Sequence, residues 1–402
     1  MSARRMSVPV VPVVVPVAQV CTGLLQSFAQ VSDGRSDQGR DHPVAAVLAL
    51  AAAATVAGMG GYTAITGWVA EVPAEIRHNL YRRSGAAPAA APSKATLWRV
   101  VTGADPQAFD AAVGTWLTRG LSAMLKAAEH VPATGKAPLM MQIRLDGKTS
   151  RGATDAEGNQ MHLLAVLIGQ PGKTTVVAAQ TEVGAKTNEV PKAVDVLDQI
   201  DLTNTVSTAD ALHTVKATAD YIHRRDGFFL LPVKENRAAL YAACDALPWA
   251  STPIAHKHTE RGHGRITRRT IRVLPAPEDL PFPHVKQVYL IERYVTDTTG
   301  QSPSAAAALG VTNLTDTLAG PADLATYVQD HWGVESLHWL RDTCYREDNS
   351  HAHTRSGPRI LASLRNLAIG ALRLAGRHDI TEATRWANRY MYRPFTILGL
   401  TF

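Results

Sequence analysis

The order of segment types along the chain constrains its fold more than any other feature. Residues from about 36 to 130 carry apolar side chains at helical spacing, and this pattern changes near Leu139. Three apolar segments then follow in close succession, separated by short stretches that contain glycine. Apolar runs joined in this way predict an antiparallel meander of three strands.

Helices and strands alternate after this meander. The pattern predicts a helix over Asn188–Ile200, a strand at TVSTAD, a helix over Ala211–Arg225 and a strand at FFLLPVK. Three antiparallel strands followed by alternating helices and strands are the element order of an RNase H-like domain. The predicted fold class is therefore α/β, with an RNase H-like domain at its centre.

Different patterns flank this α/β part. Before it, Asp105 as N-cap and Pro106 at the first helical position predict a long helix with one apolar stripe. Between residues 237 and 326 the helical signal fades, and short apolar runs predict a β-rich insertion. Helical character returns over Ala322–Asp342 and Pro358–Leu374.

These changes divide the chain into six predicted segments. They are an extended, poorly ordered arm over residues 1–34, a helical N-terminal domain over 35–130, the first part of the RNase H-like domain over 131–236, the β-rich insertion over 237–326, the last part of the RNase H-like domain over 327–376, and a C-terminal tail over 377–402.

Cysteine content and hydropathy limit the class of protein. Three cysteines stand far apart without a CxxC pair, which argues against a disulfide framework and a cysteine-ligated zinc site. The apolar stretch Pro43–Gly58 is shorter than the ~20 residues that span a bilayer, so we expect a buried helix there. Prolines interrupt the valine-rich N-terminus, which is unlike a signal peptide. We expect a cytoplasmic protein without a membrane segment.

Two aspartates stand where predicted strands end. Asp146 closes QIRLD, and Asp210 closes TVSTAD. Because the first and fourth strands of an RNase H-like sheet are neighbours, the two carboxylates would lie side by side. Adjacent carboxylates repel each other, and hard oxygen ligands favour Mg²⁺ or Mn²⁺ between them. Two such ions are suited to attack on a phosphodiester. For either residue alone, a helix cap or an Asx turn is the alternative interpretation.

A third acid is available in HWGVESLHWLRDTCYRED. Four polar residues of this segment share one face of a helix: His331, Glu335, His338 and Asp342. Glu335 could therefore face the two aspartates, while Trp332 and Trp339 on another side anchor the helix. Glu347 and Asp348, a few residues further on, are the competing candidates.

Basic residues gather between positions 256 and 272, where only Glu260 opposes them. The chain as a whole has 41 basic and 35 acidic residues, a net charge of +6, so this local excess is more informative than the total. Glycine and β-branched residues in the segment predict a hairpin. Its arginines, among them Arg265, Arg268 and Arg269, could contact a phosphate backbone or simply be solvated.

Several longer motifs carry a family resemblance. They are HPVAAVLALAAAATVAG, PSKATLWRVV, DGKTSRGA, KTNEVP, TADALHT, VKENRAAL, HWGVESLHW, REDNS and LRNLAIGALRLAG, and they extend from about residue 35 to 375. In these motifs the chain resembles the DDE transposases of bacterial insertion sequences, of the ISAs type with a DDE-transposase-associated N-terminal domain. It departs from the usual pattern after Lys234, where Glu235 and Arg237 replace Gly and Gln.

The resemblance implies a reaction and a set of functional residues. Asp146, Asp210 and Glu335 would be the catalytic, metal-ligating acids, and Mg²⁺ or Mn²⁺ would support DNA cleavage and strand transfer without a covalent enzyme intermediate. Further DNA contacts would come from residues in the family motifs: Lys148, Arg151, Lys186, Asn188, Lys234 and His338. A helix-capping role is the alternative for the segment 186–189.

The resemblance also implies partners and leaves alternatives open. The partners would be double-stranded DNA, both element ends and target, and a second copy of the chain in a homodimer or higher oligomer. Such a protein would be associated with the bacterial nucleoid. The alternatives are a metal-dependent nuclease that cuts without joining and a transposase-derived DNA-binding protein without catalytic activity. The three intact acids argue against the latter.

Overall fold

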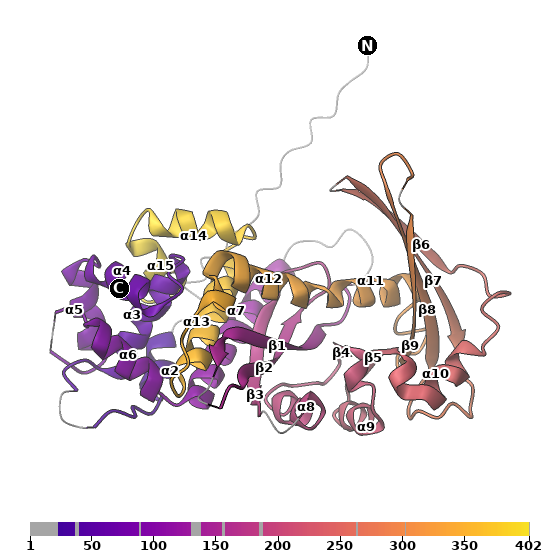
Figure 1. Cartoon of the computed structure of the whole chain (residues 1–402), viewed down its shortest axis with the longest axis horizontal. Coiled ribbons are helices and arrows are strands. Elements are labelled where there is room, and N and C mark those ends of the chain that lie inside the picture. The colour runs from indigo at the N-terminus through magenta and orange to yellow at the C-terminus, as the bar shows by residue number, and fades with distance from the viewer. Residues whose placement is uncertain are drawn as a thin grey trace, which may run out of the picture.

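The computed structural model describes residues 23–36, 40–87, 90–129, 138–154, 157–184, 188–262, 264–301 and 303–401. Its elements form a helical part at one end of the molecule, and one large sheet extends from there to the other end (Figure 1). Residues 1–22 of the predicted arm lie outside the described residues.

The described elements before residue 130 are helices. Their bounds are α2 (Leu24–Ala29), α3 (Val44–Val56), α4 (Tyr62–Ala70), α5 (Ala74–Arg83), α6 (Lys94–Gly103) and α7 (Pro106–Glu129). Every residue of α3 from Ala45 to Val56 is buried, so the predicted core helix is confirmed. The predicted N-cap of the long helix is also confirmed, because Asp105 Oδ1 accepts hydrogen bonds from the backbone N–H groups of Gln107 and Ala108 at 2.9 and 3.2 Å.

Among the residues that the structure describes, a single sheet of nine strands forms the rest of the framework. Its strands are β1 (Gln142–Thr154), β2 (Gln160–Gly169), β3 (Val176–Val183), β4 (Val206–Ala209), β5 (Phe228–Val233), β6 (His256–Gly262), β7 (Arg265–Pro275), β8 (Gln287–Asp297) and β9 (Ser304–Thr312). They are ordered β3-β2-β1-β4-β5-β9-β8-β7-β6. The predicted meander β1-β2-β3 is confirmed as antiparallel, whereas β1-β4 and β4-β5 pair in parallel.

Helices pack on the sheet and connect its strands. Their bounds are α8 (Glu189–Leu197), α9 (Lys216–Arg224), α10 (Ala238–Asp245), α11 (Pro321–His331), α12 (Gly333–Tyr345), α13 (Gly357–Leu374), α14 (Ile380–Asn388) and α15 (Tyr392–Ile397), with short 3-10 turns η1 (Ala211–His213), η2 (Glu235–Arg237) and η3 (Glu347–Asn349). In Figure 1, α11 and α12 run along the upper side of the molecule and α8 and α9 lie below. The buried helix α13 joins the two parts, because it contacts β3 as well as α3 and α7.

The predicted β-rich insertion does not form a separate sheet. Strand β9 pairs antiparallel with β5, and β8, β7 and β6 follow in order, so the insertion extends the central sheet. The pairing satisfies the backbone groups on the side of β5 that would otherwise be an open edge. The segment also contains the helix α10.

Four other predicted elements differ in detail. The helix expected over Ala322–Asp342 is two helices, with Trp332 between α11 and α12. The helix expected over Ala211–Arg225 is split into η1 and α9. Part of the predicted extended arm is the helix α2, whose Leu24, Leu25 and Phe28 are buried in the core. The predicted C-terminal tail contains the helices α14 and α15.

Hydropathy agrees with the prediction made for Pro43–Gly58. Across the part of the chain that the structure describes, no helix combines the length and the apolar composition that crossing a bilayer requires.

Candidate active site

The parallel pairing of β1 and β4 brings Asp146 and Asp210 to adjacent positions. Leu145 of β1 is opposite Ala209 of β4, and each aspartate is the next residue along its strand. The prediction that Asp146 closes its strand is wrong, because β1 continues to Thr154 and Asp146 is paired with Ala165 of β2. Antiparallel pairing with β2 continues beyond Asp146 and supports the longer β1. Of the two parallel strands, β4 is the one that ends beside Asp146.

Other carboxylates act on Asp146. Its pKa is raised to about 6, chiefly by burial and also by repulsion from Glu189, Asp210 and Glu335, while the backbone N–H of Gly147 opposes the shift. The two other predicted acids therefore lie within electrostatic reach of Asp146. This is a local excess of negative charge in a half-buried place.

Asp210 also has the capping role that sequence left open. Its Oδ1 accepts a hydrogen bond from the backbone N–H of Leu212 at 2.8 Å, at the start of η1. The cap fixes the carboxylate at the end of β4 and uses one of its two oxygens. Capping and a functional role are therefore compatible in this residue.

Helix α12 carries Glu335 and His338 toward the aspartates. Glu335 is in the first turn and is exposed, whereas His338 is half-buried, with Nδ1 3.6 Å from Asp146 Oδ2. Burial lowers the pKa of His338 to about 3, so its imidazole is neutral at neutral pH. The structure thus places His338 beside Asp146, and its predicted DNA contact stays a prediction.

Trp339 does not anchor this helix, contrary to the prediction, whereas Trp332 lies against the guanidiniums of Arg293 and Arg269, 5.1 and 5.7 Å from its ring centre. The exposed fractions of Trp332 and Trp339 are 44% and 61%, and Val334, Leu337 and Leu340 are buried in their place. The break after α11 is one reason for this difference, because Trp332 lies between α11 and α12 and Trp339 lies within α12.

Glu347, one competitor for the third acid, is occupied by arginines. Its two oxygens accept hydrogen bonds from Arg341 Nε and Nη2, both at 2.6 Å, and Ser150 Oγ donates to Oε1 at 2.7 Å. Arg365 Nη1 lies 3.4 Å away. Burial alone would raise the pKa of Glu347, but the two guanidiniums and the Ser150 hydroxyl hold it well below its usual range. Glu347 is therefore a buried structural carboxylate.

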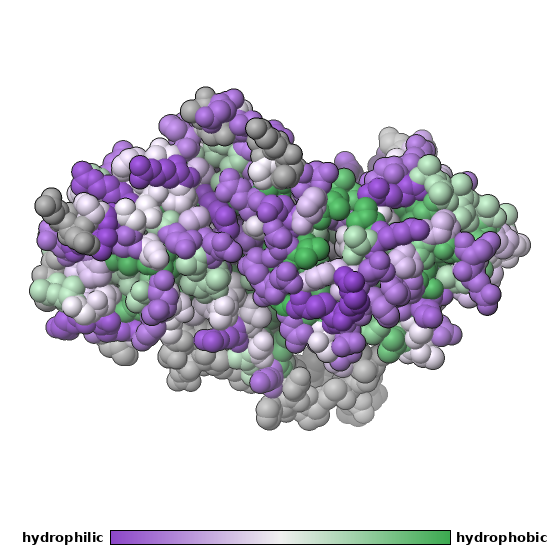
Figure 2. Space-filling model, turned by 90° about the horizontal axis from the view of Figure 1, so that it is seen from below, coloured by the Kyte–Doolittle hydropathy of each residue, from purple (hydrophilic) through white to green (hydrophobic). Residues whose placement is uncertain are grey.

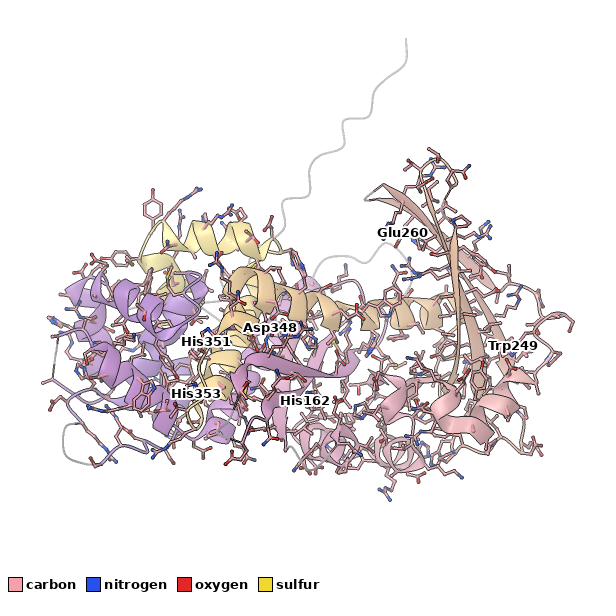
Figure 3. All side chains as sticks on the ribbon, viewed as in Figure 1. His162, Trp249, Glu260, Asp348, His351 and His353 are labelled. Atoms are coloured by element: carbon pink, nitrogen blue, oxygen red, sulfur yellow. The ribbon has the colours of Figure 1, made fainter. Side chains whose placement is uncertain are left out.

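Asp348, the other candidate for the third acid, lies close to two basic side chains. Its Oδ1 is 3.7 Å from Lys148 Nζ, and its Oδ2 is 3.6 Å from Arg151 Nε. Figure 3 shows Asp348 in the region between the helical part and the sheet, close to His351. Glu335 is among the carboxylates that raise the pKa of Asp146.

The predicted DNA contacts around β1 and β5 have different surroundings. Lys148 is buried and its Nζ donates to Asp342 Oδ2 at 2.8 Å, so it is engaged inside the protein. Asn188 caps α8, with Oδ1 accepting from the backbone N–H of Val190 at 3.1 Å, which is the alternative role considered for its segment. Arg151 and Lys234 are exposed. Lys186 lies outside the described residues.

The predicted basic hairpin is confirmed as β6 and β7. Arg265 and Arg268 are exposed, and the guanidinium of Arg268 lies 4.7 Å from the ring centre of Tyr294. Arg269 pairs with Glu260 at 2.8 Å, so its charge is partly neutralised. Figure 3 shows Glu260 near the projecting upper end of the large sheet. The role of the β6–β7 hairpin in DNA binding stays a prediction.

Sequence reasoning missed a histidine–glutamate–histidine group beside Asp146. Glu189 Oε1 lies 2.7 Å from His162 Nε2, and its Oε2 lies 3.0 Å from His213 Nε2. Burial would raise the pKa of Glu189, but these two hydrogen bonds lower it to about 2. A Cβ atom on Gly147 would be 2.2 Å from Glu189 Oε1, so the glycine permits the close approach. The glycine directly after Asp146 was the available signal.

The residue types at this site fit a hard divalent cation, although the side chains are not gathered around one. Carboxylate oxygens from three elements are the ligands that Mg²⁺ and Mn²⁺ prefer, and a cation would relieve the repulsion that raises the pKa of Asp146. Within the described residues, no three His, Cys, Asp or Glu side chains stand in an arrangement that could hold a metal ion.

Comparison with known families identifies the class of protein. Residues 141–370 match the family described as the transposase DDE domain, and residues 25–117 match the family described as DDE_Tnp_1-associated. The first match covers more than half of the chain. The protein therefore belongs to the transposase DDE-domain family, and the resemblance drawn from its motifs is confirmed.

Individual relatives agree with this assignment. The chain is 25% identical over 360 residues to "Putative transposase YncI" of Escherichia coli O157:H7, covering 87% of both chains. It is 22% identical over 362 residues to "H repeat-associated putative transposase YhhI" of E. coli K12, covering 87% of this chain and 90% of the relative. A protein from Xanthobacter autotrophicus, named only for its place in the dhlA 3' region, is 29% identical over 247 residues, covering 60% and 76% respectively.

A solved structure of a transposase shares a weak likeness. It is the piggyBac transposase synaptic complex with hairpin DNA, with a TM-score of 0.40 and 10% identity over 92% of this chain and 78% of the other. Similarity at this level carries no argument about the present fold.

Proposed function

We propose that this protein is a divalent-metal-dependent transposase that cleaves DNA and joins it to a target through Asp146, Asp210 and Glu335. The observation that carries the proposal is the electrostatic proximity of these acids: β1 and β4 pair in parallel beside the two aspartates, and Asp210 and Glu335 both raise the pKa of Asp146. Membership of the transposase DDE-domain family supports it.

The proposed catalytic domain is RNase H-like. The order β3-β2-β1-β4-β5, with three antiparallel strands followed by two parallel ones, supports this assignment. Residues 35–130 would form the helical N-terminal domain, and residues 237–326, which include β6–β9, would be the insertion before the third acid. In this fold the acids come from β1, from the end of β4 and from α12.

Each proposed residue has a defined task. Asp146, Asp210 and Glu335 would hold Mg²⁺ or Mn²⁺, which when bound activates a water or 3′-hydroxyl and stabilises the leaving oxygen. His338, neutral and next to Asp146, leaves the carboxylate's negative charge available to the cation. The Glu189 group adds negative charge from the other side of Asp146.

DNA would be held by exposed basic residues. Arg151, Lys234, Arg265 and Arg268 are accessible for phosphate contacts, which position a duplex without reading its sequence. The partners would be the element's terminal repeats and the target DNA. Since two ends must be paired before strand transfer, the active form would contain at least two copies of the chain.

The test uses labelled DNA that carries the flanking element ends, with Mg²⁺ or Mn²⁺. We expect metal-dependent nicking at the element boundary and joined products, both lost in Asp210→Ala. The control is Asp348→Asn, which removes a half-buried carboxylate outside the proposed triad and should keep both activities. Nicking without joined products would indicate a nuclease. Specific binding without cleavage in either metal would refute the catalytic proposal.

A further inference from the structure

The two helices at the C-terminus lie beyond the residues that match the DDE domain. The match ends at residue 370, whereas α14 covers Ile380–Asn388 and α15 covers Tyr392–Ile397. These helices are built into the protein, because α14 contacts α3, α12 and α13, and Trp68 Nε1 donates to Asn388 Oδ1 at 2.9 Å. They therefore form a fixed surface and not a loose extension.

Arginines are spaced at helical intervals along this surface. Arg385 lies in α14, Arg389 is the C-cap residue four positions further on with helical backbone angles, and Arg393 lies in the separate helix α15. Side chains four residues apart lie on the same face. We call Arg377 and these three residues the C-terminal arginine face.

Two of the four guanidiniums are held by stacking. The guanidinium carbons of Arg377 and Arg393 lie 3.4 and 4.2 Å from the ring centre of Trp386, and Arg393 also lies 4.2 Å from that of Tyr390. Arg393 Nη1 donates to the carbonyl of Trp386 at 2.7 Å. Cation–π stacking fixes the plane of a guanidinium while its edge can still donate hydrogen bonds.

The other two guanidiniums are available. Arg385 and Arg389 are exposed, and neither makes an ion pair or hydrogen bond with another residue in the part of the chain that the structure describes. The acidic residues of α14 lie at its other end: Asp379 caps the helix by accepting from the backbone N–H of Glu382, and Glu382 lies 3.3 Å from Arg377. One further acid, Glu75 of α5, accepts a hydrogen bond from Tyr392 of α15. The second half of α14 is therefore positively charged.

The orientation of this surface matches that of the basic hairpin. In Figure 1, α14 lies along the upper side of the helical part, and the β6–β7 end of the sheet projects to the same side. Helices α8 and α9 face the other way; Figure 2 shows that lower face, which is mainly hydrophilic with scattered hydrophobic residues. A long, negatively charged partner could thus meet both basic elements at once.

We propose that the C-terminal arginine face binds the phosphate backbone of duplex DNA at a distance from the active site. Oriented guanidiniums at regular spacing suit phosphate oxygens, which they can contact with two parallel hydrogen bonds. The inference rests on the proposed function in taking DNA as the partner, and it adds a second contact region that the catalytic acids do not define.

The test compares two double variants of the full-length chain. Arg385→Gln with Arg389→Gln removes two exposed charges from the arginine face. Lys216→Gln with Arg224→Gln removes two exposed charges from α9 on the opposite side. Binding of a labelled duplex carrying the element's terminal sequence is measured by anisotropy over a range of salt concentrations. Each lost phosphate contact lowers the slope of log K against log[salt] by about 0.9.

We expect the arginine-face variant to lose about 2 from the magnitude of this slope, at about 0.9 for each of two contacts. The α9 control should keep the wild-type slope and should nick DNA at the wild-type rate. Equal slopes in all three proteins, while the wild type binds and cleaves, would overturn this inference alone. A lowered melting temperature without a change in slope would do the same and would indicate a purely structural role. A wild type that binds no duplex would overturn the proposed function as well.

Discussion

Two carboxylates only twelve positions apart, Glu335 and Glu347, have opposite surroundings. Glu347 is buried between Arg341 and Arg365, and its charge is fully matched inside the protein. Glu335 is exposed and adds to the negative potential at Asp146, where burial and three carboxylates raise a pKa to about 6. Charge that is neutralised within the fold stabilises it, whereas charge that is left unmatched indicates a site for an external cation.

The largest effect on activity is expected at the unmatched acid. Glu335→Gln removes one charge from the site and keeps the shape of the side chain, so we expect cleavage of element-end DNA to fall to the level of a metal-free reaction. Because Glu335 is exposed, the free energy of unfolding of the variant protein should differ from that of the wild type by less than about 0.5 kcal/mol. Cleavage assays and urea denaturation of the same preparation measure both quantities, and wild-type cleavage would remove Glu335 from the site.

Replacement of Glu347, whose charge is matched by two arginines, should strongly lower the stability of the protein. Glu347→Ala leaves the buried guanidiniums of Arg341 and Arg365 without their partner, and breaking a buried pair in this way costs about 3–5 kcal/mol of unfolding free energy. Urea denaturation measures the loss, with the exposed Glu382→Ala as control. A change as small as that of the control would show that the buried cluster is not a structural element.

A methyl group at Gly147 should sharpen the comparison within the site itself. In Gly147→Ala the new Cβ would meet Glu189 Oε1 at 2.2 Å, so the carboxylate must move away from its two histidines. Overpacking of this kind costs about 1–3 kcal/mol. Gly67→Ala is the control, since a Cβ there meets nothing within 4 Å. Equal stability of the two variants would contradict the close packing described for Glu189.

The smallest expected effect is a pH dependence of stability in metal-free buffer. The folded-state pKa of Asp146, about 6, is above its value in the unfolded chain, which is about 3.9. The folded protein therefore holds this proton more tightly, and stability is lost as the pH rises from about 4 to above 6. We expect the stability of Asp146→Asn relative to wild type to increase over this interval. Parallel pH profiles of the two proteins would contradict the shift.

Local patterns were sufficient to predict a large part of the fold. The meander, the buried helix α3, the capped helix α7 and the basic hairpin each depend on residues close together in sequence. The neighbourhood of Asp146 and Asp210 required one further step, the pairing of β1 with β4. Motifs alone also identified the family.

The features that the sequence did not predict depend on packing between segments that are far apart in the chain. Glu189 reaches Asp146 because α8 packs on β2 and β3, and its histidine partners come from β2 and η1. The pairing of β9 with β5, which makes the insertion part of the central sheet, joins segments about eighty residues apart. Likewise, the commitment of Lys148 to Asp342 depends on α12 lying beside β1.

The most direct test of the account is Mn²⁺ binding measured by isothermal titration calorimetry without DNA. Wild type is compared with Glu335→Gln, which changes the exposed acid of α12, and with Asp348→Asn, which changes the acid near Lys148 and Arg151. The account predicts weaker Mn²⁺ binding in Glu335→Gln and wild-type binding in Asp348→Asn. Weaker binding in Asp348→Asn together with wild-type binding in Glu335→Gln would contradict the assignment of the third acid.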